Sequence, residues 1–201
     1  MAHAFDEEIV FAVAALRRGE IVAYPTETFY GLGVDALDEL ALARLRALKG
    51  RDRKAISVLV DGPAMLDSLC ESIPPLAATL MQRYWPGALT IALPARRNLP
   101  AALVDDGCVA VRQSSHPTAQ ALVSRLGRPL TATSANRAGE APATTDEAVD
   151  EIFTGRCRVV HGGATAGGAP STLVRVRGSK VEILRRGAIE IDLDPPVRGK
   201  G

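Results

Sequence analysis

The chain has 201 residues, 47% of them hydrophobic, which suits one domain with a substantial core and leaves little room for a second. Lys and Arg number 24 against 23 Asp and Glu, so the overall charge argues against strong non-specific attachment to nucleic acid or membranes, although a local basic groove stays open. Three widely spaced cysteines and only three histidines argue against a disulfide framework and a Cys/His metal site.

The N-terminal stretch and the hydropathy give no sign of targeting or membrane insertion. MAHAFDEEIV is acidic and amphipathic rather than basic and then apolar. No apolar run reaches the roughly 20 residues that a membrane span needs. We therefore expect a soluble, cytoplasmic protein with no membrane partner.

The first part of the chain alternates helices and strands. Asp6, followed by two glutamates, begins a helix that ends at Gly19, and IVAY then favours a buried strand. Asp38 caps a second helix over residues 39–48, and ISVLV, residues 56–60, is typical of the next strand. This order predicts an α/β fold.

The later part of the chain continues in the same way. The pattern predicts helices at 63–71, 75–85 and 117–126, a helix capped near Thr145 or Asp146, and strands at 88–93, 108–112 and 129–133. Two alternating runs joined by Gly178 and Ser179 predict a terminal hairpin. We expect one domain over residues 1–191 and a disordered tail over residues 192–201.

Two glycine motifs lack the context of the nucleotide sites that they resemble. GLGVDA, residues 31–36, fits the dinucleotide pattern G-x-G-x-x-A, but PTETFY separates it from its strand and no ordinary helix begins there. Gly163 and Gly168 repeat the glycine spacing of a phosphate-binding P-loop, yet Ala169 stands where the lysine is needed. No G-x-S-x-G anchors a hydrolase triad, and His116 precedes a proline at a helix start.

Four polar clusters stand at the expected strand ends and strand-to-helix loops. They are PTETFYG (25–31), KGRDRK (49–54), VRQSSHP (111–117) with TATSAN (131–136), and PST (170–172) with LRRG (184–187). Any one of them alone reads as an ordinary solvated loop. Together they combine lysines and arginines with hydroxyl side chains. Such a set suits an anionic ligand with many oxygens, such as a nucleotide polyphosphate or an amino-acid carboxylate.

Several motifs make the chain similar to the YrdC-like family of L-threonylcarbamoyladenylate synthases. They are YPTETFYGLGVDA, LKGR, WPGALTIAL, VAVRQSSHP, TATSANRAGEAPATT, PSTLV and LRRGAI, in the family's order and at close to its spacing. The match runs from about residue 8 to residue 190. The resemblance implies the YrdC-like fold, a single α/β domain in which a twisted mixed sheet is flanked by helices around a central concave site.

The resemblance implies a nucleotidyltransferase that makes threonylcarbamoyl-AMP and pyrophosphate from L-threonine, bicarbonate and ATP. Mg²⁺ would accompany the ATP phosphates rather than a metal site of the protein. The product would serve threonylcarbamoyladenosine modification of tRNA. Beyond the small-molecule substrates, the implied partners are tRNA or double-stranded RNA and the proteins of the tRNA threonylcarbamoyl-transferase complex.

The resemblance also implies a set of binding residues. By motif position Thr28, Arg112 and Ser171 resemble the threonine-binding residues, with Arg112 on the carboxylate. The implied ATP contacts are Lys49, Arg51, Lys54, Ser134, Asn136 and Arg185. No residue is implied as the catalytic base. We expect Gly31 and Gly33 to allow close backbone approach and positive φ.

The resemblance leaves three points open. The sequence DRKAIS departs from the family's proline-containing loop after Lys-x-Arg, which puts the role of Lys54 and the activity of the altered 52–57 loop in doubt. Glu27 could orient its loop, hold the threonine amine or hold a metal-bound water. The chain stops soon after the hairpin and so resembles the short, single-domain form of the family. The oligomeric state does not follow from the sequence.

Two other functions compete with the synthase. The first is a non-catalytic accessory protein that binds double-stranded RNA or tRNA with a basic concave face of the same fold. It would have no need for Thr28, Arg112 and Ser171 together. The second is a relative of the hydrogenase-maturation proteins, which carry a related domain. Their acylphosphatase and zinc-finger segments do not occur in this sequence.

Overall fold

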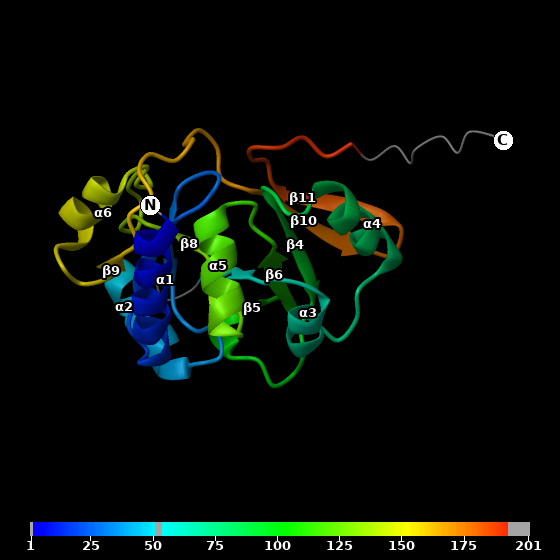
Figure 1. Ribbon diagram of the computed structural model, residues 1–201. Helices are drawn as coiled ribbons and strands as arrows, with labels where there is room; N and C mark the ends of the chain where they lie inside the picture. The colour runs from blue at the N-terminus through cyan, green and yellow to red at the C-terminus, as the bar shows by residue number, and fades with distance from the viewer. Residues whose placement is uncertain (1, 51–53, 193–201) are drawn as a thin grey trace.

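The structure is a computed structural model that describes residues 2–50 and 54–192 (Figure 1). Its helices are α1 (Ala2–Arg17), α2 (Glu39–Lys49), α3 (Pro63–Leu69), α4 (Pro75–Tyr84), the 3-10 turn η1 (Ala101–Leu103), α5 (Pro117–Leu126) and α6 (Asp146–Phe153). Its strands are β1 (Val22–Pro25), β2 (Tyr30–Gly33), β3 (Val58–Leu59), β4 (Leu89–Pro94), β5 (Val104–Asp105), β6 (Cys108–Arg112), β7 (Leu130–Thr131), β8 (Thr133–Ser134), β9 (Arg158–Val159), β10 (Thr172–Arg177) and β11 (Lys180–Arg185). The predicted helices and the terminal hairpin are confirmed, except that α1 begins at Ala2 and not at Asp6, since the alanines before Asp6 are strong helix formers. β2, β5 and β9 were not predicted.

The strands form two sheets. A four-stranded sheet has the order β8-β2-β1-β9, and a seven-stranded sheet has the order β11-β10-β4-β6-β3-β7, with β5 paired to β6. Both sheets are mixed: β1 is parallel to β9 and antiparallel to β2, and β4 is parallel to β10 and antiparallel to β6. The predicted mixed α/β architecture is confirmed, and its strands are divided between two sheets.

Residues 130–134 link the two sheets, although residues 129–133 were predicted as one strand. β7 pairs with β3 of the larger sheet, and β8 pairs with β2 of the smaller one. Thr131 is fully buried at this crossing. Its hydroxyl accepts a hydrogen bond from the backbone N–H of Val34 at 2.9 Å and donates one to the carbonyl of Leu32 at 3.3 Å. This polar side chain is therefore satisfied in the core and fixes one sheet against the other.

The loop between β1 and β2 is the turn of a hairpin that the sequence did not predict. Tyr24 pairs with Gly31 in the register, and its ring lies over both glycines of β2. A Cβ at Gly31 would come within 3.2 Å of that ring, and one at Gly33 within 2.7 Å. The expected close approach at these glycines is confirmed. The expected positive φ was wrong, because neither is among the glycines with positive φ.

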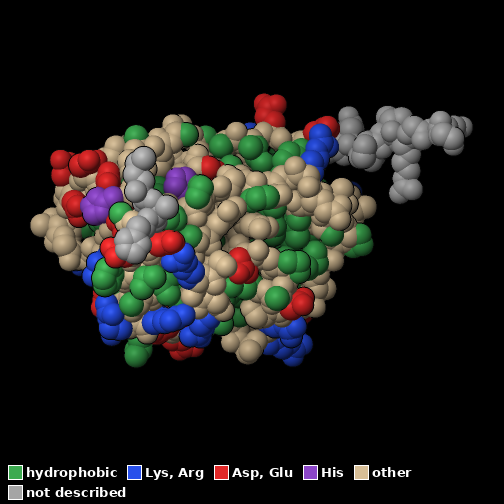
Figure 2. Space-filling view, viewed as in Figure 1, with side chains coloured by type: hydrophobic (Ala, Val, Ile, Leu, Met, Phe, Trp, Pro, Cys, Tyr) green, Lys and Arg blue, Asp and Glu red, His purple; other side chains and the backbone are tan. Residues whose placement is uncertain are grey.

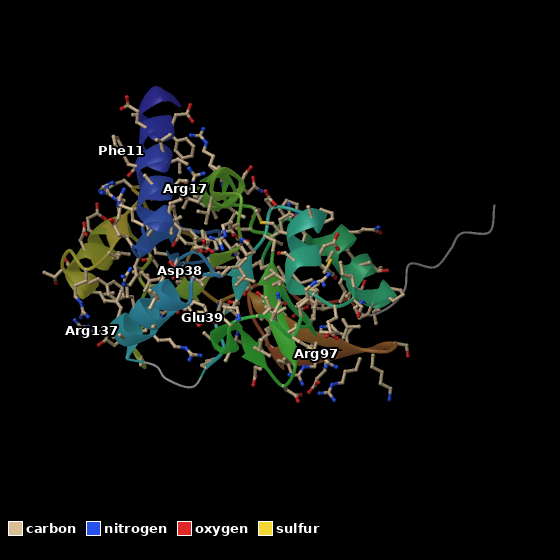
Figure 3. The ribbon with its side chains drawn as sticks, turned by 90° about the horizontal axis from the view of Figure 1, so that it is seen from below. Phe11, Arg17, Asp38, Glu39, Arg97 and Arg137 are labelled. Atoms are coloured by element: carbon tan, nitrogen blue, oxygen red, sulfur yellow. The ribbon has the colours of Figure 1, made fainter. Side chains whose placement is uncertain are left out.

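The helix ends follow their local sequence. Asp38 accepts hydrogen bonds from the backbone N–H groups of Leu40 and Ala41, at 2.9 and 3.0 Å, and so caps α2 as predicted. Figure 3 shows Asp38 and Glu39 together at the start of this helix. Thr145 caps α6 through its hydroxyl. These caps fix where the helices begin, and hence the loops that enter the site.

The helices are divided between the two sheets. In Figure 1, α1, α2 and α6 gather around the smaller sheet, α3 and α4 lie beside the larger one, and α5 runs next to α1. On the face toward the viewer in Figure 2, basic side chains gather at the lower left, with acidic ones above them. Among the described residues, no helix combines the length and the apolar composition needed to cross a bilayer.

Candidate functional site

The predicted polar clusters meet in one cleft because of the strand directions. β6 is antiparallel to β4, and β10 is parallel to β4, so the end of β6 lies beside the beginnings of β4 and β10. This brings Arg112 to Thr90 and Ser171. β11 returns antiparallel along β10, which carries Arg185 back to the same place. The smaller sheet and its β1–β2 loop supply the opposite wall through Thr26, residues 28–31 and residues 133–134.

The loop after β1 presents two threonines to the cleft, Thr26 and Thr28, each 6% exposed. The hydroxyl of Thr26 donates to the carbonyl of Phe29 at 2.7 Å and accepts from the backbone N–H of Thr28 at 3.2 Å. The two hydroxyls lie 3.2 Å apart. Because the Thr26 proton is used on Phe29, Thr28 is the donor between them. Its lone pairs remain available to accept from a ligand.

Arg112 is the last residue of β6, and two nitrogen atoms of its guanidinium contact other residues of the protein. Its Nε donates to the carbonyl of Gly87 at 3.1 Å, and its Nη2 lies 2.5 Å from Oε1 of Glu27. Oε2 of Glu27 accepts from the hydroxyl of Ser114 at 2.5 Å. Burial by itself raises the pKa of Glu27, but the Arg112 guanidinium and the Ser114 hydrogen bond outweigh it and hold that pKa below its ordinary value of 4.5. The pair is therefore ionised at neutral pH.

Ser171 lies between a buried hydroxyl and a guanidinium. Its Oγ is 2.8 Å from that of Thr90. Arg185 donates to the Ser171 carbonyl from Nε and Nη2, at 3.1 and 2.8 Å, and to its hydroxyl at 3.1 Å. Gly187 allows this approach, since a Cβ there would lie 2.1 Å from the carbonyl oxygen of Pro170. Gly187, the glycine of LRRG, therefore allows this segment to pack closely against PST, residues 170–172.

Lys49, predicted as a phosphate contact, is enclosed by the protein in this structure. The residue is 4% exposed. Its ammonium donates to the carbonyl of Ser134, to the carbonyl of Asn136 at 3.2 Å and to Oδ1 of Asn136 at 3.1 Å. All three of these acceptors belong to residues 134–136. Lys49 thus holds the Ser-x-Asn loop from behind.

The Ser-x-Asn loop is also held by its own hydrogen bonds. The hydroxyl of Ser134 donates to Oδ1 of Asn136 at 2.6 Å, and Nδ2 of Asn136 donates to the carbonyl of Glu140 at 2.7 Å. Ser134 lines the cleft, whereas Asn136 is buried at 4% exposure. Asn136 therefore affects a ligand indirectly, by fixing the position of Ser134 and its loop.

The cleft is positively charged. Lys54, Arg112 and Arg185 line it, and no carboxylate side chain is among the described residues that do so. Burial, and then repulsion from Arg112, lower the pKa of Arg185 below its ordinary value. Arginine stays protonated in proteins even so. Two guanidiniums and a lysine facing hydroxyl groups favour a ligand that carries several negative charges.

The described residues of the cleft do not include the ligands of a resident metal. In the described part of the chain, no group of three His, Cys, Asp or Glu side chains is placed to hold a metal ion. Mg²⁺ prefers carboxylate, phosphate and water oxygens, and the cleft offers hydroxyls and cations. These residues fit a Mg²⁺ ion that arrives on phosphate oxygens of the ligand, and do not fit one bound by protein carboxylates.

Two of the three histidines, His116 and His161, have structural partners. His116 caps α5, its Nδ1 accepting from the backbone N–H of Thr118 at 3.3 Å, and burial lowers its pKa. Nδ1 of His161 lies 2.8 Å from Oε1 of Glu8, and this partner raises the pKa of His161. Neither histidine is among the residues that line the cleft. The geometry therefore does not assign a histidine base.

The structure brings most of the predicted site residues together. The cleft is lined by Thr28, Lys54, Arg112, Ser134, Ser171 and Arg185. Lys49 and Asn136 stand behind it, and Arg51 lies outside the described residues. The sequence prediction missed Thr26, Tyr30 and Thr90. Thr90 places a hydroxyl inside the apolar run ALTIAL, where burial requires a hydrogen-bond partner for it. This polar residue in an otherwise apolar strand was the sequence signal that could have identified Thr90.

The chain is similar to known proteins over most of its length. The family model Sua5_yciO_yrdC, described as "Telomere recombination", matches residues 14–187. A threonylcarbamoyl-AMP synthase from Thiobacillus denitrificans is 41% identical over 170 residues, which cover 84% of this chain and 90% of that protein. A threonylcarbamoyl-AMP synthase from Bacillus subtilis is 39% identical, and the match covers 92% of this chain and 54% of that protein.

Solved structures share the fold. Sua5 from Pyrococcus abyssi, crystallised with L-threonine, is 36% identical with a TM-score of 0.85, and the match covers 89% of this chain and 54% of that one. The chain thus spans about half the length of the Bacillus and Pyrococcus proteins. YciO from E. coli is 24% identical with a TM-score of 0.82 and covers 92% of this chain, which supports the fold alone.

Proposed function

Because the chain belongs to the Sua5/YciO/YrdC family, we propose that it is a nucleotidyltransferase that makes threonylcarbamoyl-AMP and pyrophosphate from L-threonine, bicarbonate and ATP. The observation that carries this proposal is the convergence of Thr28, Arg112 and Ser171 with Lys54 and Arg185 in one cleft without a lining carboxylate among the described residues. One part of this set suits a small amino acid, and the other suits a polyphosphate.

The threonine end of the cleft is assigned to Thr28, Arg112 and Ser171. Nε and Nη2 of Arg112 are engaged with Gly87 and Glu27, and its Nη1 donates to the substrate carboxylate. The free lone pairs of Thr28 accept from the substrate's ammonium or hydroxyl group. Ser171, held by Thr90 and Arg185, closes the pocket. Each assignment pairs a donor of the protein with an acceptor of threonine, or the reverse.

The nucleotide end is assigned to Lys54, Ser134 and Arg185, which line the cleft. Arg51 is a further phosphate contact by its position in Lys-x-Arg. Lys49 and Asn136 contribute by holding Ser134 in place. Mg²⁺ bound to the triphosphate would supply charge neutralisation at the reacting phosphates.

The chemistry requires little covalent participation by the protein. The threonine amine adds to bicarbonate with loss of water to give a carbamate, and a carbamate oxygen then attacks the α-phosphorus of ATP as pyrophosphate leaves. Arg112 holds the carboxylate so that the amine lies near the bicarbonate, and Arg185 and Lys54 stabilise the charge on the phosphates. Proximity and electrostatic stabilisation are the dominant contributions to such a transfer.

The product has a defined use. A mixed anhydride of a carbamate and AMP is an activated acyl donor, and it would be consumed by threonylcarbamoylation of an adenosine in tRNA. The proteins that perform this transfer, and tRNA itself, are the proposed partners in the cytoplasm. A non-catalytic RNA-binding role gives no reason for Thr28, Arg112 and Ser171 to meet in a narrow cleft, so the synthase is favoured.

The activity is tested by pyrophosphate release from the purified protein with L-threonine, bicarbonate, ATP and Mg²⁺. We expect release that needs threonine and bicarbonate, together with a threonylcarbamoyl adenylate detected by mass spectrometry. Serine and alanine serve as matched controls for the amino-acid end. Pyrophosphate release that is the same without threonine would contradict the proposed function.

A further inference from the structure

Glu27 belongs to the conspicuous motif PTET, yet it is not among the residues that line the cleft. Its side chain is 17% exposed, and that of its partner Arg112 is 8% exposed. A carboxylate so placed must be paired, because burying an unpaired charge is costly. Its Oε1 faces Nη2 of Arg112 and its Oε2 faces the hydroxyl of Ser114, both at 2.5 Å. Both carboxylate oxygens are therefore committed to the protein.

Ser114, the second partner, belongs to a rigid segment. Its hydroxyl accepts from the backbone N–H of His116 at 3.2 Å, and its carbonyl accepts from Nε2 of Gln120 in α5 at 2.9 Å. Glu27 is thereby tied to the beginning of α5 as well as to the end of β6. Thr28, the next residue, is tied to the loop after β9, since the N–H of Gly167 donates to its carbonyl at 2.7 Å.

Glu27 consequently joins the two halves of the amino-acid pocket. It comes from the hairpin of the smaller sheet, next to Thr28, while Arg112 ends a strand of the larger sheet. In the described part of the chain, no other carboxylate forms an ion pair with Arg112. This ion pair therefore links the loop that carries Thr28 directly to the Arg112 guanidinium.

We propose that Glu27 is a positioning residue for the amino-acid substrate, acting through Arg112. It holds Nη2 on the side away from the cleft, so that Nη1 faces the substrate carboxylate at a set distance from Thr28. This inference rests on the proposed function, and it assigns to Glu27 neither a metal-bound water nor the substrate amine. The opposite arrangement, in which Glu27 competes with the substrate for Arg112, predicts the reverse effect of its removal.

The test is a double-mutant cycle with Glu27→Gln, Arg112→Ala and the double variant. Glutamine keeps the size of the side chain and removes its charge. We expect Glu27→Gln to weaken L-threonine binding by about tenfold, the effect of one charged hydrogen bond that is held less well. The affinity for ATP should stay within about twofold, since the partners of Glu27 among the described residues, Arg112 and Ser114, are not assigned to phosphate. In the Arg112→Ala background, Glu27→Gln should have no further effect on threonine.

Ser114→Ala is the second variant, because it loosens Glu27 without removing a charge; we expect a smaller loss of threonine affinity with ATP affinity intact. Unchanged or tighter threonine binding by folded Glu27→Gln would overturn the proposal, as would additive losses in the cycle. An equal loss of threonine and ATP affinity would reduce Glu27 to a general structural role and would also overturn it. If the wild-type protein binds no threonine, the proposed function itself fails, and that outcome is distinct from all of these.

Discussion

Replacing Arg112 by alanine will weaken L-threonine binding by about 1.5–3 kcal/mol, the usual contribution of a hydrogen bond to a charged group, which corresponds to about 10- to 150-fold in Kd. The reason is that Arg112 is the cation at the amino-acid end of the cleft, with Nε and Nη2 already committed to Gly87 and Glu27. ATP affinity should fall much less. Calorimetry with threonine and with a slowly hydrolysed ATP analogue measures both.

Two further variants make this result interpretable. Arg97→Ala is the matched control, since that side chain is 97% exposed and is not among the residues that line the cleft. It should leave both affinities unchanged. Arg112→Ala also leaves the Glu27 carboxylate without its cation, and the double variant with Glu27→Gln removes that buried charge. Threonine affinity equal to that of the wild type in Arg112→Ala would remove Arg112 from the site.

Replacing Lys49 by methionine will lower the free energy of unfolding by about 1–3 kcal/mol, because the carbonyl of Ser134, the carbonyl of Asn136 and Oδ1 of Asn136 each lose one charged donor. Methionine fills a similar volume, so the change reports the lost hydrogen bonds rather than a cavity. Urea unfolding followed by circular dichroism measures it, and hydrogen exchange should show a loosened 134–140 loop.

Lys180→Met is the control for this substitution, since Lys180 is an exposed lysine at the beginning of β11. It should leave the stability unchanged. Any effect of Lys49→Met on ATP binding should accompany the loosening of the loop. Full stability combined with a large, salt-dependent loss of ATP affinity would instead identify Lys49 as a direct phosphate ligand and would contradict the structure-based assignment.

Local signals in the sequence were sufficient to predict the helices. Asp38 and Thr145 cap their helices because a short polar side chain that precedes an apolar stripe satisfies the first free N–H groups. The terminal hairpin was predictable for a similar reason, since Gly178 has the positive φ that its turn requires. These features depend on neighbours within a few residues, which a sequence displays directly.

The features that failed depend on distant partners. The glycines of YGLG belong to a strand because the Tyr24 ring covers them, and glycine by itself disfavours strands. The run PLTAT is divided between two sheets because Thr131 bonds to residues about 100 positions earlier in the chain. Local propensity contains no information on either contact.

The residues of the candidate site were predicted from the family resemblance, and the structure then distinguished those that line the cleft from those that lie behind it. Motif position named six of the residues that line the cleft, and the strand directions explain why they meet. The roles of Lys49 and Glu27 could not be predicted, because each depends on whether a charged side chain faces the cleft or the protein behind it. Burial and hydrogen-bond partners distinguish these cases, and neither can be read from the order of residues.

The most direct test of the central claim is calorimetry of the wild-type protein with L-threonine, alone and in the presence of an ATP analogue and Mg²⁺. One cleft that holds both substrates predicts one threonine and one nucleotide per chain, with each ligand strengthening the binding of the other by the same factor. Binding of nucleotide with no threonine heat under either condition would contradict the account, as would threonine binding that is indifferent to the nucleotide.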